Sequence, residues 1–124
     1  MKNSKNRKFT CKGINNALAI LGSNRFNIIR IDILIDGRAD GHPRLKNLID
    51  NHPVSQLRKD QFYKKHCENR TQGIIIEFSG KLIEDKLPDF KNKSNVCLLA
   101  LDQIEDPQNF GQIIRTAECA GING

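Results

Sequence analysis

The residues best suited to chemistry lie close together between Asp102 and Arg115, in the segment DQIEDPQNFGQIIR. Asp106 suits a helix N-cap and Pro107 the first helical position, although Asn109 could take the cap instead. Arginine pairs favourably with phosphate, and Arg115 lies off the apolar stripe of the helical pattern. On a straight helix Asn109 and Arg115 would be about 120° apart and separated by ~9 Å of rise. Either something bridges these two side chains, or Asn109 lies in the loop before the helix.

The same residues have purely structural interpretations. Asn109 can be a cap, Arg115 a surface or salt-bridged cation, and Gly111 a point of close packing, and spacing alone favours this set. The sequence shows no Ser-His-Asp, paired-carboxylate or metal-ligand pattern. Three histidines stand beside basic residues or proline in polar stretches, so we predict that they are solvated at the surface. These are His42, His52 and His66.

The elements around this segment must position it. Val96 to Leu101 is an apolar run that predicts a strand, residues 102–108 form a polar break, and a helical pattern runs from Asn109 to the last residue. This order is the start of an α/β unit, in which ligands bind outside the carboxyl ends of strands. The chain stops before a second strand, which indicates a fragment or a truncated protein.

Helical and strand patterns alternate upstream. Residues 28–36 alternate β-branched with mostly polar side chains and are the clearest strand. The remaining predicted elements are a helix at 13–22, a helix from Pro43, a very short strand at Val54, a basic helix at 55–67 and a strand at 74–78. This order predicts a small α/β sandwich. The predicted organisation is a disordered basic arm at 1–8, a domain at 9–88, a linker at 89–95 and the start of a second domain at 96–124.

Charge and composition favour a nucleic-acid partner. The net charge is +6 and the pI about 9.3, which favours polyanions, with nucleic acid ahead of membrane. No segment approaches the ~18 apolar residues that a membrane span needs, and no secretory signal is present. The four cysteines are far apart and form no CxxC pair. They predict reduced thiols without a metal site in a cytoplasmic protein.

Residues 102–122, DQIEDPQNFGQIIRTAECAGI, resemble the first signature motif of the SpoU/TrmH family of RNA ribose 2′-O-methyltransferases. That motif has the pattern DPxNxGxxxRxAxxxG, which this chain matches without a gap. The matching residues are Asp106, Pro107, Asn109, Gly111, Arg115, Ala117 and Gly121. The stretches KGINNALAIL, IIRIDILID and TQGIIIEF resemble the family's amino-terminal substrate-binding domain, an L30e-like α/β sandwich. The resemblance covers nearly the whole chain and is greatest to members that methylate a guanosine ribose in large-subunit (23S) ribosomal RNA.

The resemblance implies a two-domain enzyme. Its first domain would recognise RNA, and its second would be a trefoil-knotted SPOUT domain that binds S-adenosylmethionine and forms a homodimer. It implies that Arg115 helps to deprotonate or position the ribose 2′-hydroxyl, with support from Asn109, because a cation stabilises a developing alkoxide. The family motifs that form the knot and the cofactor pocket would lie after Gly124. We therefore predict that residues 1–124 alone neither bind S-adenosylmethionine nor transfer methyl groups.

RNA contacts are predicted at cations of the basic arm and of the helix at 55–67. The resemblance implies further contacts at two polar residues before the strand at 74–78, and ribosomal RNA is favoured over transfer RNA. A charged, solvated helix face is an equal alternative for the helix cations. The predicted contacts are Lys8, Lys12, Arg58, Lys59, Lys64, Lys65, Arg70 and Gln72. Two other hypotheses are a non-catalytic L30e-like RNA-binding module, and a truncated product whose exposed strand at 96–101 promotes aggregation. A continuation of the chain beyond Gly124 that carries the remaining family motifs would favour the enzyme over both.

Overall fold

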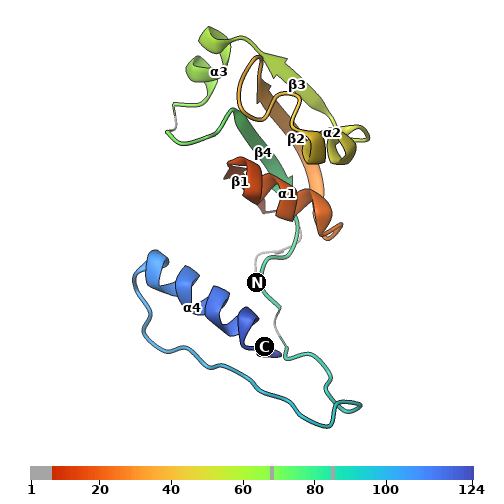
Figure 1. The fold of residues 1–124 in the computed structure, drawn as a ribbon, viewed down its shortest axis with the longest axis vertical. Helices are drawn as coiled ribbons and strands as arrows, with labels where there is room; N and C mark the ends of the chain where they lie inside the picture. The colour runs from red at the N-terminus through yellow and green to blue at the C-terminus, as the bar shows by residue number, and fades with distance from the viewer. Residues whose placement is uncertain (1–6, 68, 85) are drawn as a thin grey trace. The chain divides into compact units, whose positions relative to one another are not determined.

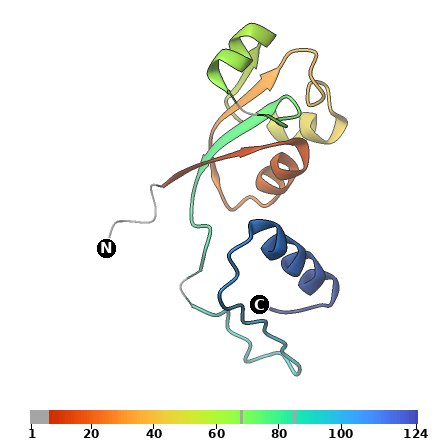
Figure 2. The ribbon, with the colours of Figure 1, turned by 90° about the vertical axis from the view of Figure 1, so that its left-hand side faces the viewer.

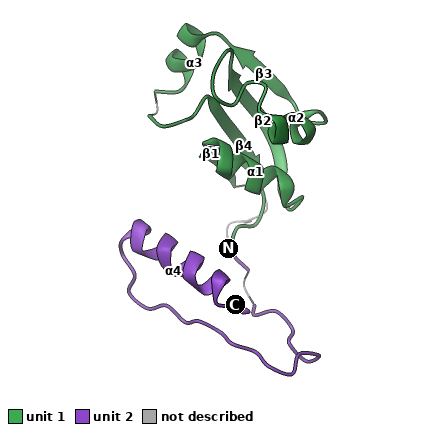
Figure 3. Ribbon diagram, viewed as in Figure 1, with its two compact units in different colours: residues 1–82 green, residues 83–124 purple. Residues whose placement is uncertain are grey.

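The computed structural model of the chain describes residues 7–67, 69–84 and 86–124. The chain divides into two compact units, Met1–Leu82 (unit 1) and Ile83–Gly124 (unit 2), which are coloured separately in Figure 3. The division falls a few residues before the predicted linker. Most of the predicted basic arm lies outside the described residues, and its last residue, Lys8, begins the first strand.

A four-stranded mixed sheet forms the centre of unit 1 (Figure 1). Its strands are β1 (Lys8–Lys12), β2 (Asn27–Leu34), β3 (Val54–Leu57) and β4 (Ile74–Ser79), in the spatial order β1-β4-β2-β3. β2 and β3 run parallel, with Ile31 opposite Val54, whereas β4 is antiparallel to both β1 and β2. A parallel pair needs a crossover connection, and the segment that contains α2 makes this connection.

Two helices cover one face of the sheet. α1 (Ile14–Gly22) follows β1, α2 (Pro43–Ile49) connects β2 to β3, and the two helices lie side by side (Figure 2). Alternate residues of β2 and β4 face them and form the core. The buried cluster comprises Ala17, Leu21, Ile31, Ile33, Ala39, Leu45, Ile74, Ile76 and Phe78. The predicted helix at 13–22, the helix from Pro43 and the strands at 28–36 and 74–78 are confirmed within one or two residues at each end.

The short helix α3 (Lys59–Lys65) packs against β2. Its one buried residue is Phe62, which is completely shielded from solvent. Asp32 of β2 lies between the core residues Ile31 and Ile33 in sequence, so it faces the opposite side of the sheet, where it contacts the end of α3. α3 therefore covers part of the face that α1 and α2 leave open.

Two predictions for unit 1 were wrong in detail. The basic helix predicted at 55–67 is shorter, because residues up to Leu57 form β3 and pair with β2. The strand β1 was not predicted, because its lysines resemble a solvated basic arm. Its burial alternates nevertheless, since Phe9 and Cys11 pack against the core while Lys8 and its other polar residues face solvent.

Unit 2 contains one helix, α4 (Pro107–Cys119), and an extended segment before it. The strand predicted at 96–101 is wrong, because the described residues of this unit offer no strand for it to pair with. Its backbone instead exchanges hydrogen bonds with the chain after α4, including Leu99 N to Gly124 O at 2.8 Å. The predicted helix also ends before the last residue, where Gly121 takes a left-handed conformation with φ +74°.

Candidate nucleic-acid interface

Three connecting segments meet at one edge of the unit 1 sheet. The parallel strands β2 and β3 end there, at Leu34 and Leu57, and the antiparallel β4 begins there, at Ile74. The residues that follow β2, the helix α3 and the loop before β4 therefore come together. Ligands in α/β structures bind outside the carboxyl ends of parallel strands. This edge is therefore the candidate binding site of unit 1.

Two adjoining hollows open at this edge. The first has a volume of about 460 Å³ and is lined mainly by polar residues, among them Asp36, Arg38, Tyr63, Arg70 and Gln72. The second, of about 490 Å³, is lined by Leu34, Ile35, Asp36, Arg58, Lys59 and Tyr63. Both hollows share Leu34, Asp36 and Tyr63, so they form one continuous surface. We call its four cations, Arg38, Arg58, Lys59 and Arg70, the basic rim.

The backbone of the first hollow is unusually constrained. Among the described residues, five that are not glycine have positive φ, and three of these, Asp36, Arg70 and Gln72, line this hollow. Gly73 has φ +79°, and a Cβ there would lie 3.4 Å from the Cα of Gly37. Such conformations cost of order 1–3 kcal/mol each and concentrate at functional sites. The left-handed residues of these two loops therefore mark the first hollow as a candidate functional site.

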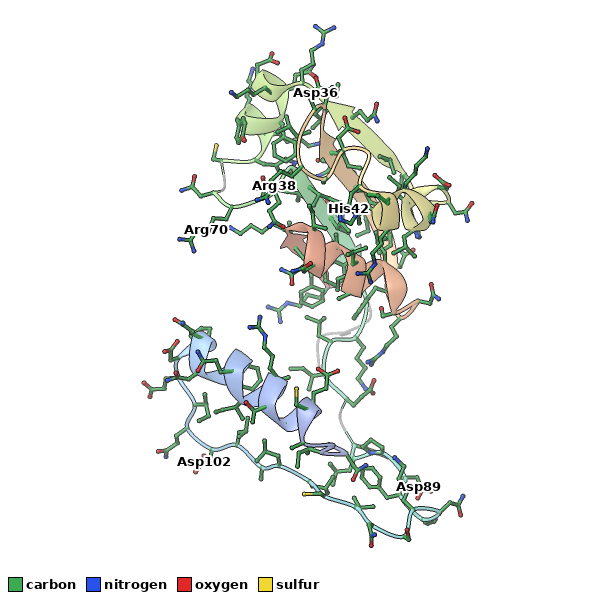
Figure 4. The ribbon with its side chains drawn as sticks, in the orientation of Figure 1. Asp36, Arg38, His42, Arg70, Asp89 and Asp102 are labelled. Atoms are coloured by element: carbon green, nitrogen blue, oxygen red, sulfur yellow. The ribbon has the colours of Figure 1, made fainter. Side chains whose placement is uncertain are left out.

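The structure brings together three of the cations that were predicted to contact RNA. Arg58, Lys59 and Arg70 all belong to the basic rim, and the Arg70 side chain extends away from the fold in Figure 4. No ion pair is recorded for any of these three in the described part of the chain. Lys64 is exposed on α3 but lines neither hollow.

The other predicted contacts lie elsewhere or have structural roles. Lys65 Nζ is 2.9 Å from Asp32 Oδ2, and Lys8 and Lys12 are at the two ends of β1. The Gln72 side chain lines the first hollow, but its Oε1 accepts a hydrogen bond from the Ile14 N–H at 2.8 Å. Gln72 therefore caps the first turn of α1 and holds the loop against it.

Two members of this surface were not predicted. Arg38 lies in the turn after β2, and Tyr63 is the one tyrosine in the sequence. The Tyr63 side chain is 47% exposed and lines both hollows. An exposed aromatic residue among cations is a signal of nucleic-acid binding. The sequence held this signal, because Tyr63 lies between Lys59 and Lys64.

Charged and polar groups gather around the buried Asp32 and anchor the end of α3. Asp32 is 1% exposed, and its Oδ2 lies 2.7 Å from His66 Nε2, 2.9 Å from Lys65 Nζ and 3.3 Å from Arg30 Nε. Burial raises the pKa of Asp32, but the hydrogen bonds from Lys65 and His66 and the charge of Arg30 outweigh burial and hold that pKa below its usual value. The prediction that His66 is solvated is therefore wrong, since its side chain is 11% exposed and pairs with Asp32.

This cluster predicts a pH dependence of stability. Because the folded-state pKa of Asp32 is lowered, its stabilising contribution is complete above the unfolded pKa of about 3.9 and is lost as the pH falls through the folded pKa. We expect the urea concentration at which the chain is half unfolded to decrease as the pH is lowered below about 4. This decrease should be smaller in Asp32→Asn than in the parent. The exposed Asp89 is the matched control, and Asp89→Asn should leave the pH profile unchanged. If the urea midpoint changed equally with pH in the parent, Asp32→Asn and Asp89→Asn, the role of Asp32 would be contradicted.

In unit 2, the predicted catalytic residues lie on α4. Asp106 is the N-cap, and its Oδ1 accepts a hydrogen bond from the Gln108 N–H at 2.8 Å, while Pro107 is the first helical residue. Asn109 is thus inside the helix, which excludes its placement in the loop. Asn109 and Arg115 are both exposed, and six residues apart they lie on different faces of the helix. The structure does not bring these two side chains together.

The surface of unit 2 carries a large apolar area. A hollow of about 630 Å³ lies between α4 and residues 99–104, with Asn109, Gln112 and Thr116 as its polar lining. The large apolar side chains nearby are 39–48% exposed; they are Val96, Leu98, Leu99, Leu101, Ile104, Phe110 and Ile114. Exposed apolar area of this kind marks an interaction surface.

No group of three or more histidine, cysteine, aspartate or glutamate side chains in the described ranges could hold a metal ion. None of the helices that the structure describes is long and apolar enough to cross a bilayer.

Comparison with known proteins finds RNA methyltransferases. Over 119 residues the chain is 30% identical to the 23S rRNA (guanosine-2′-O-)-methyltransferase RlmB of Haemophilus ducreyi, a match that covers 90% of this chain and 47% of that protein. It is 33% identical over 98 residues to RlmB of Pseudomonas aeruginosa, covering 72% and 38% of the two chains. It is also 60% identical over 48 residues to an uncharacterized tRNA/rRNA methyltransferase of Borreliella burgdorferi, covering 39% and 21%. The chain thus spans less than half the length of these relatives, and no protein-family model matches it.

A solved structure shares the fold. The AdoMet-bound rRNA methyltransferase of Sinorhizobium meliloti superposes with a TM-score of 0.61 at 20% identity, over 95% of this chain and 42% of that one. At this identity the likeness concerns the fold alone. The sequence matches are to RNA methyltransferases. One of these matches covers 90% of the chain and therefore includes residues of both units.

Proposed function

We propose that this chain, which belongs to the SpoU/TrmH family of RNA methyltransferases, is part of an enzyme that methylates a ribose 2′-hydroxyl of RNA. The observation that carries the proposal is the match to guanosine-2′-O-methyltransferases across both units, together with the complete motif at 106–121. Those relatives act on 23S rRNA, so a guanosine of 23S rRNA is the proposed substrate.

The two units have separate proposed roles. Unit 1 is an L30e-like RNA-binding domain, supported by its basic rim and the exposed Tyr63. Unit 2 is the beginning of a SPOUT domain, supported by the motif on α4 and by apolar side chains left exposed for further packing. The same apolar area supports a homodimer of the whole protein.

Arg115 is the proposed catalytic residue. Its guanidinium is exposed on α4 and has no ion pair recorded in the described part of the chain, so it is available to substrate. A ribose hydroxyl is a poor nucleophile, and a cation beside it would stabilise the alkoxide as the proton leaves. Asn109, on another face of the helix, is proposed to support the site from a neighbouring position rather than by contact with Arg115.

The proposed methyl donor is S-adenosylmethionine, and the hollow beside α4 fits the charged groups of this cofactor poorly. The hollow beside α4 is lined by apolar residues and by three uncharged polar residues, Asn109, Gln112 and Thr116. Its lining contains no charged side chain. The ammonium and carboxylate of the cofactor would have no oppositely charged side chain there. We therefore propose that residues 1–124 alone are inactive.

The test uses the protein as its native cells make it. Its intact mass is expected to be roughly twice 14.1 kDa, since the chain covers less than half of its relatives. The purified protein should transfer a labelled methyl group from S-adenosylmethionine to unmodified 23S rRNA. Alkaline digestion should then leave the label in a dinucleotide, because a methylated 2′-oxygen cannot attack the adjacent phosphate. Transfer RNA is the matched substrate control.

Three results would overturn parts of this proposal. If alkaline digestion released the label in mononucleotides, the methyl group would be on a base and not on the ribose. Turnover by the 124-residue chain alone would mean that its own residues hold the cofactor. RNA binding by unit 1 without methyl transfer by the native protein would favour the second candidate, a non-catalytic RNA-binding module, which the separate core and basic rim of unit 1 also support.

A further inference from the structure

We propose that the surface formed by the two hollows of unit 1 binds one unpaired nucleotide of an RNA strand. The base stacks on Tyr63, and the phosphates on either side of it are bound by the two halves of the basic rim. This inference rests on the proposed function, because it assumes that unit 1 binds RNA, and it adds that the recognised segment is single-stranded.

Tyr63 is placed as a stacking surface. Its ring is 47% exposed, although its neighbour in sequence, Phe62, is completely buried. The two rings meet edge to face, with centroids 5.6 Å apart and an interplanar angle of 82°. The buried ring therefore holds Tyr63 in position while one side of Tyr63 faces the hollows. Aromatic side chains of this kind bind any base by its π-face.

The cations lie on both sides of Tyr63. Arg38 and Arg70 line the first hollow and not the second, whereas Arg58 and Lys59 line the second and not the first. Tyr63 lines both, so it lies between the two pairs. This arrangement matches a strand that crosses the surface with a phosphate before and a phosphate after the stacked base.

Asp36 also lies at the centre, since it lines both hollows. Its backbone N–H donates to Asp40 Oδ2 at 2.9 Å, which fixes the residue with φ +58°. A carboxylate repels phosphate, so its presence keeps phosphates at the outer pairs of cations and leaves the centre to the base and ribose. Base and ribose both offer hydrogen-bond donors to a carboxylate.

A paired strand cannot satisfy this arrangement. In a duplex the bases are stacked on one another, and proteins recognise RNA duplexes mainly through phosphates and ribose hydroxyls. A single aromatic ring between cations can be reached only by a base that is unstacked. The surface therefore selects a loop, a bulge or a free single strand.

The experiment measures binding of the 124-residue chain to a fluorescein-labelled RNA 12-mer, either single-stranded or annealed to its complement, by anisotropy. Tyr63→Leu removes the ring and keeps an apolar side chain, while Tyr63→Phe keeps the ring. We expect Tyr63→Leu to weaken single-strand binding about 5- to 100-fold and Tyr63→Phe to bind as the parent does. Arg38→Ala should weaken binding and reduce its salt dependence. Arg44, a cation of α2 outside both hollows, is the control, and Arg44→Ala should bind as the parent does.

The possible failures are distinguishable. If the parent binds single-stranded RNA but Tyr63→Leu and Tyr63→Phe bind equally well, the inference is wrong and the proposed RNA-binding role remains. Tighter binding of the duplex would overturn the inference in the same way. If the parent binds neither RNA, both the inference and the RNA-binding role of unit 1 are wrong. Circular dichroism of each variant confirms that the exposed substitutions leave the fold intact.

Discussion

Replacing Arg115 by alanine in the native, full-length protein is expected to lower methyl transfer about 100-fold or more while changing RNA affinity less than about twofold. Loss of a group that stabilises a developing oxyanion costs two to three orders of magnitude in rate. Two different units carry the groups concerned, because Arg115 belongs to α4 of unit 2 and the basic rim belongs to unit 1. Arg115 is exposed, so its removal should not unfold the helix. Single-turnover transfer and RNA anisotropy measure the two quantities.

Two variants make this result interpretable. Arg115→Lys keeps the charge but not the planar guanidinium, and it should recover part of the rate if charge is what matters. Arg44→Ala removes an exposed arginine of unit 1 that is outside both hollows, and it should change neither quantity. An unchanged transfer rate in Arg115→Ala would remove Arg115 from the catalytic site. A parallel loss of RNA affinity would make it a binding residue.

The elements of unit 1 could be predicted where hydrophobic periodicity was strong. The alternation through Ile31 and Ile33 identified β2, and the apolar spacing of 14–21 identified α1. β1 was missed because lysines alternate with its inward residues, and in a short edge strand they resemble a solvated arm. The strand predicted at 96–101 was wrong for another reason. It was predicted from an apolar run, and such a run indicates a tendency to form a strand without supplying the strand that it must pair with.

Only part of the candidate site could be predicted from the sequence. Arg58 and Lys59 were predicted as RNA contacts from their charge, and Arg70 from the family resemblance, whereas Arg38 and Tyr63 were not predicted. Their proximity depends on where β2, β3 and β4 begin and end, which local patterns determine only within a few residues. The contact of Asp32 with His66 could not be predicted either, because His66 is distant in sequence and comes near only when α3 packs on the sheet. Tertiary contacts of this range are absent from local sequence patterns.

Phe62→Ala is expected to destabilise unit 1 by about 3–5 kcal/mol, the usual cost of deleting a fully buried phenylalanine side chain. α3 has seven residues, too few for a stable isolated helix. Phe62 is its one buried residue and also contacts the His66 ring, with centroids 5.2 Å apart. Small domains have only about 5–15 kcal/mol of total stability. The urea midpoint should therefore fall sharply, and at temperatures where the variant still folds, α3 should lose protection from hydrogen exchange first.

The consequence should extend to RNA, because α3 carries Tyr63 and is preceded by Arg58. When α3 detaches from the sheet, the second hollow loses a wall, and single-strand binding should weaken in step with the loss of hydrogen-exchange protection in α3. Phe110→Ala is the matched control: Phe110 is 46% exposed on α4, so this variant should stay within about 0.5 kcal/mol of the parent. If Phe62→Ala has the same urea midpoint as the parent, Phe62 does not anchor α3. The ionic contacts of Asp32 must then hold α3 on the sheet, and Asp32→Asn should detach it. The two substitutions thus separate apolar from ionic anchoring of the helix that carries Tyr63.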